Sequence, residues 1–140
     1  MNDRLTMIVP GKPEYVGTVR IAASHVASRA GFDIEAIEDI KVAISEACTN
    51  IVCHSHENVD FTYSVELELE PEGNKFSITV KDEGVGFGVD DYVEPVPGEE
   101  RESGLGIFII RALMDEVDIS SELGVGTKIC MTKYLRSTPV

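Results

Sequence analysis

The chain has 140 residues, of which 43% are hydrophobic and 26% are charged, a composition typical of one soluble globular domain and not of a disordered or fibrous protein. Twelve Lys and Arg against 25 Asp and Glu give a formal net charge of −13, which argues against nucleic-acid binding because that requires clustered cations. The same acidity disfavours a polyanionic ligand, unless backbone amides or a metal ion meet its phosphates.

The N-terminus and the cysteines suggest a cytoplasmic protein. The first ten residues lack the basic and apolar regions of a secretory signal, and no apolar run approaches the roughly 18 residues that span a bilayer. An odd number of cysteines (Cys48, Cys53 and Cys130) fits reduced thiols better than a disulfide framework. We therefore expect one cytoplasmic domain over residues 1–140, with no membrane contact.

The first half of the chain predicts a strand and two helices. Residues 5–9 read as a short strand that stops at Pro10-Gly11. Apolar residues at spacings of three and four predict a helix from Glu14 to Ala30, with Gly31 as its C-terminal cap. Asp33 can cap a second helix, whose buried stripe is the strongest helical pattern in the chain: Ile37, Ile40, Ile44, Ala47 and Ile51.

The second half predicts strands around an irregular segment and a helix. Strict alternation over 61–69 and 76–80 indicates an antiparallel hairpin. Residues 87–103 have no periodicity and hold six acids, and such a stretch in a compact domain is usually functional or disordered. A helix from Leu105 to about Val117 and two strands, at Ile119 and 129–132, follow. This order predicts an α+β fold, a two-layer α/β sandwich with a mainly antiparallel sheet and helices on one face.

Two of three short clusters combine into a candidate phosphate and metal site. Glu46 and Asn50 lie four apart, on one side of the second helix and away from its apolar stripe. Gly104 and Gly106 place backbone N–H groups at a helix N-terminus, which favours phosphate. Asn50 offers a neutral oxygen for Mg²⁺. Each feature alone also fits a solvated helix face or a simple helix cap, and no P-loop motif is present in the sequence.

The base side of this candidate site follows the hairpin. Asp82 can accept a hydrogen bond from the exocyclic amine of adenine, whereas a guanine carbonyl there would be repelled. Gly84 and Gly86 allow the backbone to approach base and ribose closely, although Asp-x-Gly-x-Gly alone is commonly just a turn. Thr127 can add a hydroxyl on the base side. The combined pattern predicts a nucleotide site.

Glu46-x-x-x-Asn50, Asp82-x-Gly84-x-Gly86 and Gly104-x-Gly106, in this order, resemble the N, G1 and G2 boxes of the GHKL ATPase superfamily. Several further stretches are similar to the bacterial anti-sigma-factor serine-protein kinases, most closely to the branch that restrains the general-stress sigma factor. They include Pro13–Val16, Ser45–Asn50 and Met131–Leu135. The resemblance extends from about Val9 to Leu135, and it implies the Bergerat (GHKL) form of the sandwich.

The resemblance implies roles for individual residues. Glu46 would be the general base that deprotonates an attacking serine hydroxyl, Asn50 would hold Mg²⁺, and Asp82 would recognise adenine. Gly104, Leu105 and Gly106 would line the phosphates of ATP, with residues 87–103 as the ATP lid. Family members phosphorylate one serine on a small anti-anti-sigma antagonist of the STAS type and otherwise sequester a sigma factor. They act as homodimers.

Several alternatives stay open from the sequence. Arg101 either reaches the γ-phosphate or is a solvated lid charge. A zinc site at Cys53-His54-Ser55-His56 matches no established ligand spacing. The protein could be a nucleotide-dependent anti-sigma binding protein without kinase turnover, in which Glu46 is incidental. A histidine-kinase fragment is disfavoured because the chain has no room for the helical hairpin with its phospho-accepting histidine.

Overall fold

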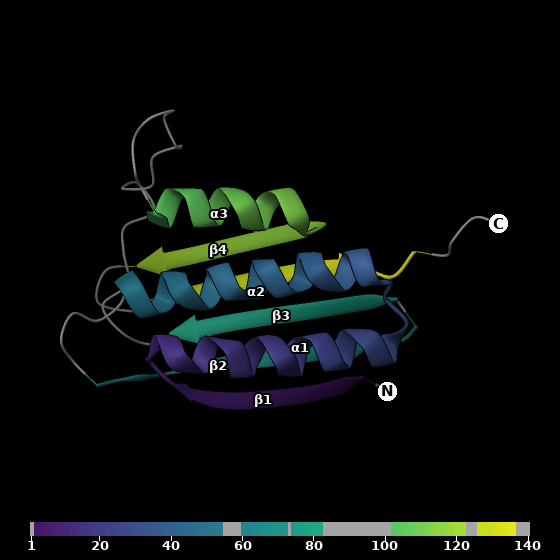
Figure 1. The fold of residues 1–140 in the computed structure, drawn as a ribbon, viewed down its shortest axis with the longest axis horizontal. Coiled ribbons are helices and arrows are strands. Elements are labelled where there is room, and N and C mark those ends of the chain that lie inside the picture. Colours follow the sequence, from purple (N-terminus) through teal and green to yellow (C-terminus); the bar gives the residue numbers. More distant parts are fainter. Residues whose placement is uncertain (1, 55–59, 73, 83–101, 123–125, 137–140) are drawn as a thin grey trace.

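The computed structural model describes residues 2–54, 60–72, 74–82, 102–122 and 126–136, and these form two layers (Figure 1). One layer is an antiparallel sheet with strand order β1-β2-β3-β5-β4. Its strands are β1 (Asp3–Pro10), β2 (Thr62–Glu70), β3 (Lys75–Asp82), β4 (Glu116–Glu122) and β5 (Gly126–Tyr134). The helices α1 (Val16–Ala30), α2 (Ile34–His54) and α3 (Glu102–Leu113) cover one face of the sheet. The predicted fold class is confirmed.

The ends of the first two helices follow from their capping residues. Pro13–Tyr15 forms a short 3₁₀ turn, so α1 begins at Val16 and not at Glu14 as predicted. Gly31 ends α1 with a φ of 104°, a left-handed conformation that glycine adopts without steric cost. The Asp33 carboxylate accepts a hydrogen bond from the backbone N–H of Ala36 at 2.8 Å. The predicted caps of both helices are therefore present.

The predicted third helix was wrong at both ends. Instead of running from Leu105 to about Val117, α3 starts at Glu102 and stops at Leu113. The chain turns at Asp115, whose backbone N–H donates to Thr132 O at 2.9 Å and so begins the pairing of β4 with β5. Val117 then lies in β4, opposite Met131. The spacing of Leu113 and Val117 resembles a helical repeat, but the alternation that starts at Val117 belongs to a strand.

The hydrophobic core lies between the sheet and the helices. It contains alternate side chains of the central strands, among them Phe76, Ile78 and Val80 of β3 and Ile129 and Met131 of β5. The predicted stripe of α2 packs on it, with Ile40, Ile44 and Ile51 fully buried. At one end of the strands, polar side chains continue the same buried rows. There Asp82 of β3 lies opposite Thr127 of β5.

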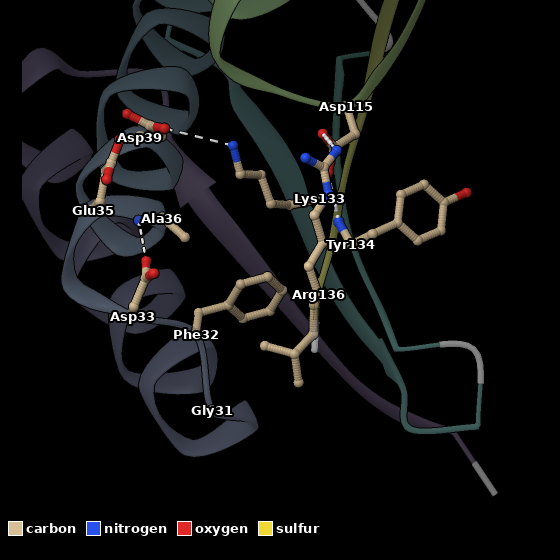
Figure 2. A pocket seen from close by; sticks show the side chains of 11 residues that line it. Gly31, Phe32, Asp33, Glu35, Ala36, Asp39, Asp115, Lys133, Tyr134 and Arg136 are labelled. Carbon is tan, nitrogen blue, oxygen red and sulfur yellow. Dashed lines mark hydrogen bonds and ion pairs between the residues drawn. The ribbon is translucent and has the colours of Figure 1, made fainter. Parts of the chain in front are cut away.

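A lysine ties the helices to the sheet at the other end of the molecule (Figure 2). Lys133 of β5 donates to the Leu113 carbonyl at the end of α3 (2.6 Å) and lies 3.5 Å from the Asp39 carboxylate of α2. Beside it, Asp115 accepts hydrogen bonds from Tyr134 N and Arg136, both at 2.8 Å. Lys133, Asp39, Asp115, Tyr134 and Arg136 all line a pocket of about 220 Å³. Most charges of this pocket are paired. The contacts of Lys133 link α2, α3 and β5 at this end of the molecule.

Candidate functional site

The predicted site residues come from five elements that meet at one end of the sheet. In Figure 1 the last turns of α2, the first turn of α3 and the tips of β3 and β4 lie at the same end. The first residues of β5 join them, because Thr127 pairs with Asp82 on one side and with Ser121 on the other. Segments that are far apart in the sequence therefore converge here. This is the end opposite the Lys133 contacts.

Glu46 and Gly106 place α2 directly against α3. Glu46 is half-buried on α2, and Gly106 is buried in α3. A Cβ placed on Gly106 would lie 3.0 Å from Glu46 Oε2, which is tighter than ordinary van der Waals contact. The missing side chain thus lets the carboxylate lie against the α3 backbone. The candidate base and the candidate phosphate-binding helix are in contact.

Asn50 has a buried carboxamide, one turn after Glu46 on α2. The residue is only 4% exposed, and neither Oδ1 nor Nδ2 has a hydrogen-bond partner within the described part of the chain. Such groups are rare in folded proteins, because burying a polar group without a partner costs about 1–3 kcal/mol. A buried amide oxygen of this kind fits Mg²⁺, which prefers oxygen ligands. The arrangement excludes the simple reading of Asn50 as a solvated helix residue.

Asp82 and Thr127 form the candidate base-recognition side. Each is 2% exposed, and the two are paired across β3 and β5 on the face toward the helices. Ser121 of β4 extends this row, since its hydroxyl lies 2.9 Å from that of Thr127. The row lines a pocket of about 270 Å³ together with Lys81, Ser120, Gly126 and Lys128.

Of the other predicted site residues, the structure describes only some. Gly104 and Leu105 lie in the first turns of α3, and the Leu105 side chain is half exposed. Gly84, Gly86, Arg101 and most of the predicted lid at 87–103 lie outside the described residues. Helix α3 already includes Glu102 and Ser103, which the sequence had assigned to the lid. The roles of all these residues remain predictions.

Sequence reasoning missed Ser121, Lys81 and Lys128 on the pocket wall. A signal for Ser121 existed, because the alternation of Val117 and Ile119 continues to position 121 and so predicts that this side chain faces the core. The lysines gave no such signal. They are exposed and directly opposite each other on β3 and β5, a pairing that only the strand register shows.

The cysteines lie in different environments. On α2, Cys48 is buried and Cys53 is exposed, and both are free thiols, as is Cys130. Burial raises the pKa of Cys48 to about 12. In the described ranges, no group of three or more His, Cys, Asp and Glu could hold a metal ion; two of the four residues of the zinc alternative, Ser55 and His56, lie outside those ranges.

A family model described as a histidine kinase-like ATPase domain matches residues 9–133. A serine-protein kinase RsbW from Listeria monocytogenes serotype 4a is 38% identical, over 100% of this chain and 92% of the relative. The RsbW of Bacillus subtilis is 37% identical, over 99% and 89%. The chain belongs to the RsbW family of serine-protein kinases. The resemblance drawn from the motifs is thereby confirmed, as is the assignment to kinases with an ATPase-type domain.

Solved structures share the fold of this chain. The RsbU and RsbW domains of a Mycobacterium tuberculosis protein match with a TM-score of 0.70 and 23% identity, over 94% of this chain and 32% of that one. The histidine kinase domain of a blue-light-activated kinase from Erythrobacter litoralis matches with a TM-score of 0.58 and 21% identity, over 88% and 60%. Among the described residues, no helix has the length and apolarity to cross a membrane.

Proposed function

We propose that this kinase transfers the γ-phosphoryl group of ATP to a serine of a STAS-type anti-anti-sigma antagonist and otherwise sequesters a sigma factor. The observation that carries the proposal is the contact of Glu46 with Gly106. It places a carboxylate, able to accept the serine proton, beside the helix whose N-terminus would hold the phosphates. Phosphoryl transfer depends mainly on positioning and charge neutralisation, so a modest base suffices.

ATP with Mg²⁺ is the proposed nucleotide form. Asn50 would supply a ligand to the ion, and its buried, unpartnered carboxamide supports this role. When bound, Mg²⁺ neutralises phosphate charge during the transfer. Asp82 and Thr127 would hold the adenine, with Gly84 and Gly86 beside it. Gly104, Leu105 and Gly106 would line the phosphates beneath a lid at 87–101, since α3 begins at Glu102, and Arg101 would belong to that lid.

The charge of the chain supports the choice of partners. A net charge of −13 disfavours nucleic acid, but it complements the basic surface that a DNA-binding sigma factor needs. We further propose that residues 1–140 act as one domain, in the cytoplasm, as a homodimer. If the acidic surface does contribute, the affinity for the sigma factor falls as the salt concentration rises.

The decisive experiment compares Glu46→Gln with the wild type and with Glu38→Gln, which alters an exposed acid on the same helix. Each protein is incubated with Mg-ATP and the antagonist, and phosphoserine is measured by mass spectrometry. We expect Glu46→Gln to lose about 10²–10⁴-fold in turnover and to keep its nucleotide affinity, with Glu38→Gln active. Stoichiometric sigma-factor binding without any phosphoserine from the wild type would instead establish the binding-protein alternative.

A further inference from the structure

Ser121, Thr127 and Asp82 form a continuous buried row across three strands. Thr127 on β5 is opposite Asp82 of β3 and opposite Ser121 of β4. None of the three side chains is more than 5% exposed, and all of them line the pocket of about 270 Å³. The row lies where we propose that the nucleotide base binds, so the inference below rests on the proposed function.

The contact between Ser121 and Thr127 controls what the Thr127 hydroxyl can do. Their oxygens are 2.9 Å apart, and either one can be the donor. A hydroxyl group donates one hydrogen bond and accepts up to two. When Ser121 donates to Thr127, the proton of Thr127 is left for a ligand. Because threonine is β-branched and has few χ1 rotamers, this bond also fixes the direction in which its hydroxyl points.

A carboxylate next to a donating hydroxyl matches one purine better than the other. The Asp82 carboxylate only accepts hydrogen bonds, whereas Thr127 held in this way donates one. The Watson–Crick edge of adenine presents an amine donor beside a ring-nitrogen acceptor. Guanine presents the reverse order, a carbonyl acceptor beside a ring N–H donor. A site that binds polar groups of a ligand rejects the analogue that leaves them unpaired.

We propose that Ser121 is a positioning residue for base recognition, which holds the Thr127 hydroxyl as a donor beside Asp82 and thereby favours adenine over guanine. Ser121 acts through Thr127 and need not touch the base itself. Ser28 offers a control, because it is an exposed serine on α1 and does not line this pocket.

The test measures the affinities of Mg-ADP and Mg-GDP by isothermal titration calorimetry. We expect Ser121→Ala to weaken ADP binding about 3- to 10-fold and to lower the ADP-to-GDP affinity ratio by a similar factor. Ser28→Ala should change neither by more than about 2-fold. In a Thr127→Val background, Ser121→Ala should have no further effect on the ratio, since its action passes through the missing hydroxyl.

Three results would decide against the inference or its basis. An unchanged ADP-to-GDP ratio in Ser121→Ala, with the wild type preferring ADP, overturns the role of Ser121 alone. An equal loss of selectivity from Ser121→Ala in the Thr127→Val background overturns the proposed route through Thr127. A wild type that binds neither nucleotide overturns the proposed function itself. Thermal melts without nucleotide check folding, and Ser121→Cys, which keeps nearly the same volume, replaces Ser121→Ala if that variant unfolds.

Discussion

The carboxylate of Glu46 on α2 lies so close to Gly106 on α3 that a side chain at position 106 would crowd it. A Cβ on Gly106 would come within 3.0 Å of Glu46 Oε2. Gly106 is the fifth residue of α3, which begins at Glu102, so this contact lies one turn beyond the helix N-terminus that we expect to hold phosphate. It allows the proposed base and the proposed phosphate site to be neighbours.

Gly106→Ala should separate activity from stability. Its methyl group would displace the Glu46 carboxylate, so we expect serine phosphorylation to fall by at least about 10-fold, because small misplacements of catalytic groups are costly. The free energy of unfolding should be unchanged or higher, since alanine is favoured over glycine inside a helix by about 1 kcal/mol. Phosphorylation rates and urea unfolding measure the two quantities.

The matched control for that variant is Gly17→Ala on α1. Nothing lies within 4 Å of a Cβ at Gly17, so this variant should phosphorylate the antagonist at the wild-type rate. Full activity in Gly106→Ala would show that the carboxylate tolerates the displacement. The close approach of Glu46 to Gly106 would then not be needed for phosphorylation.

Asn50→Leu should raise the stability of the protein while it abolishes nucleotide binding. Replacing the unpartnered carboxamide by an apolar group of similar size removes two unsatisfied polar atoms. We expect the free energy of unfolding without nucleotide to rise by about 1 kcal/mol and Mg-ADP binding to be lost. Urea unfolding and calorimetry measure these, with exposed Thr49→Ala as the control. A variant that is less stable and still binds would assign Asn50 to the fold.

The sequence allowed much of the fold to be predicted, because its buried faces are regular. The stripe from Ile37 to Ile51 shows only the helical period, and the alternation around Ile78 shows only the two-residue period of a strand. At Leu113 two periods overlap, and the chain leaves the helix there for the pairing with β5, which begins with the long-range bond from Asp115 N to Thr132 O. Local patterns carry no information on such a contact.

The site could be predicted only as far as its residues form local motifs. Glu46 and Asn50 are four apart, so helix geometry alone placed them together. Their burial, and the contact with Gly106, depend on how α2 packs on α3, which no spacing reveals. The row from Asp82 to Ser121 was found only in part for the same reason, since strand order brings β4 beside β5.

Lys133→Met should destabilise the end of the molecule opposite the site. Lys133 Nζ donates to Leu113 O at 2.6 Å and lies near Asp39, and its side chain is only 15% exposed. Losing these contacts should lower the free energy of unfolding by about 1–3 kcal/mol, as measured in urea. Lys128→Met, an exposed lysine on the same strand, should change it by less than about 0.5 kcal/mol. Equal effects of the two variants would contradict the anchoring role.

The buried thiol of Cys48 predicts how stability depends on alkaline pH. Burial raises its pKa from 9.0 to about 12, so between these values the unfolded chain releases a proton that the folded chain retains. Stability is then fully present below pH 9 and declines as the pH rises, by up to about 1.4 kcal/mol per pH unit from this thiol. Burial also raises the pKa of Tyr63 above 10.0, which steepens the decline beyond pH 10.

Cys48→Ala should make this decline shallower, because the variant no longer has the thiol proton that the folded state retains. Urea unfolding at intervals from pH 7.5 to about 10.5 gives the slope for each protein. Cys53→Ala, which removes an exposed thiol from the same helix, should leave the slope of the wild type unchanged. If Cys48→Ala and the wild type lose stability in parallel across this range, the alkaline sensitivity arises elsewhere, and the Cys48 thiol is not protected by the fold.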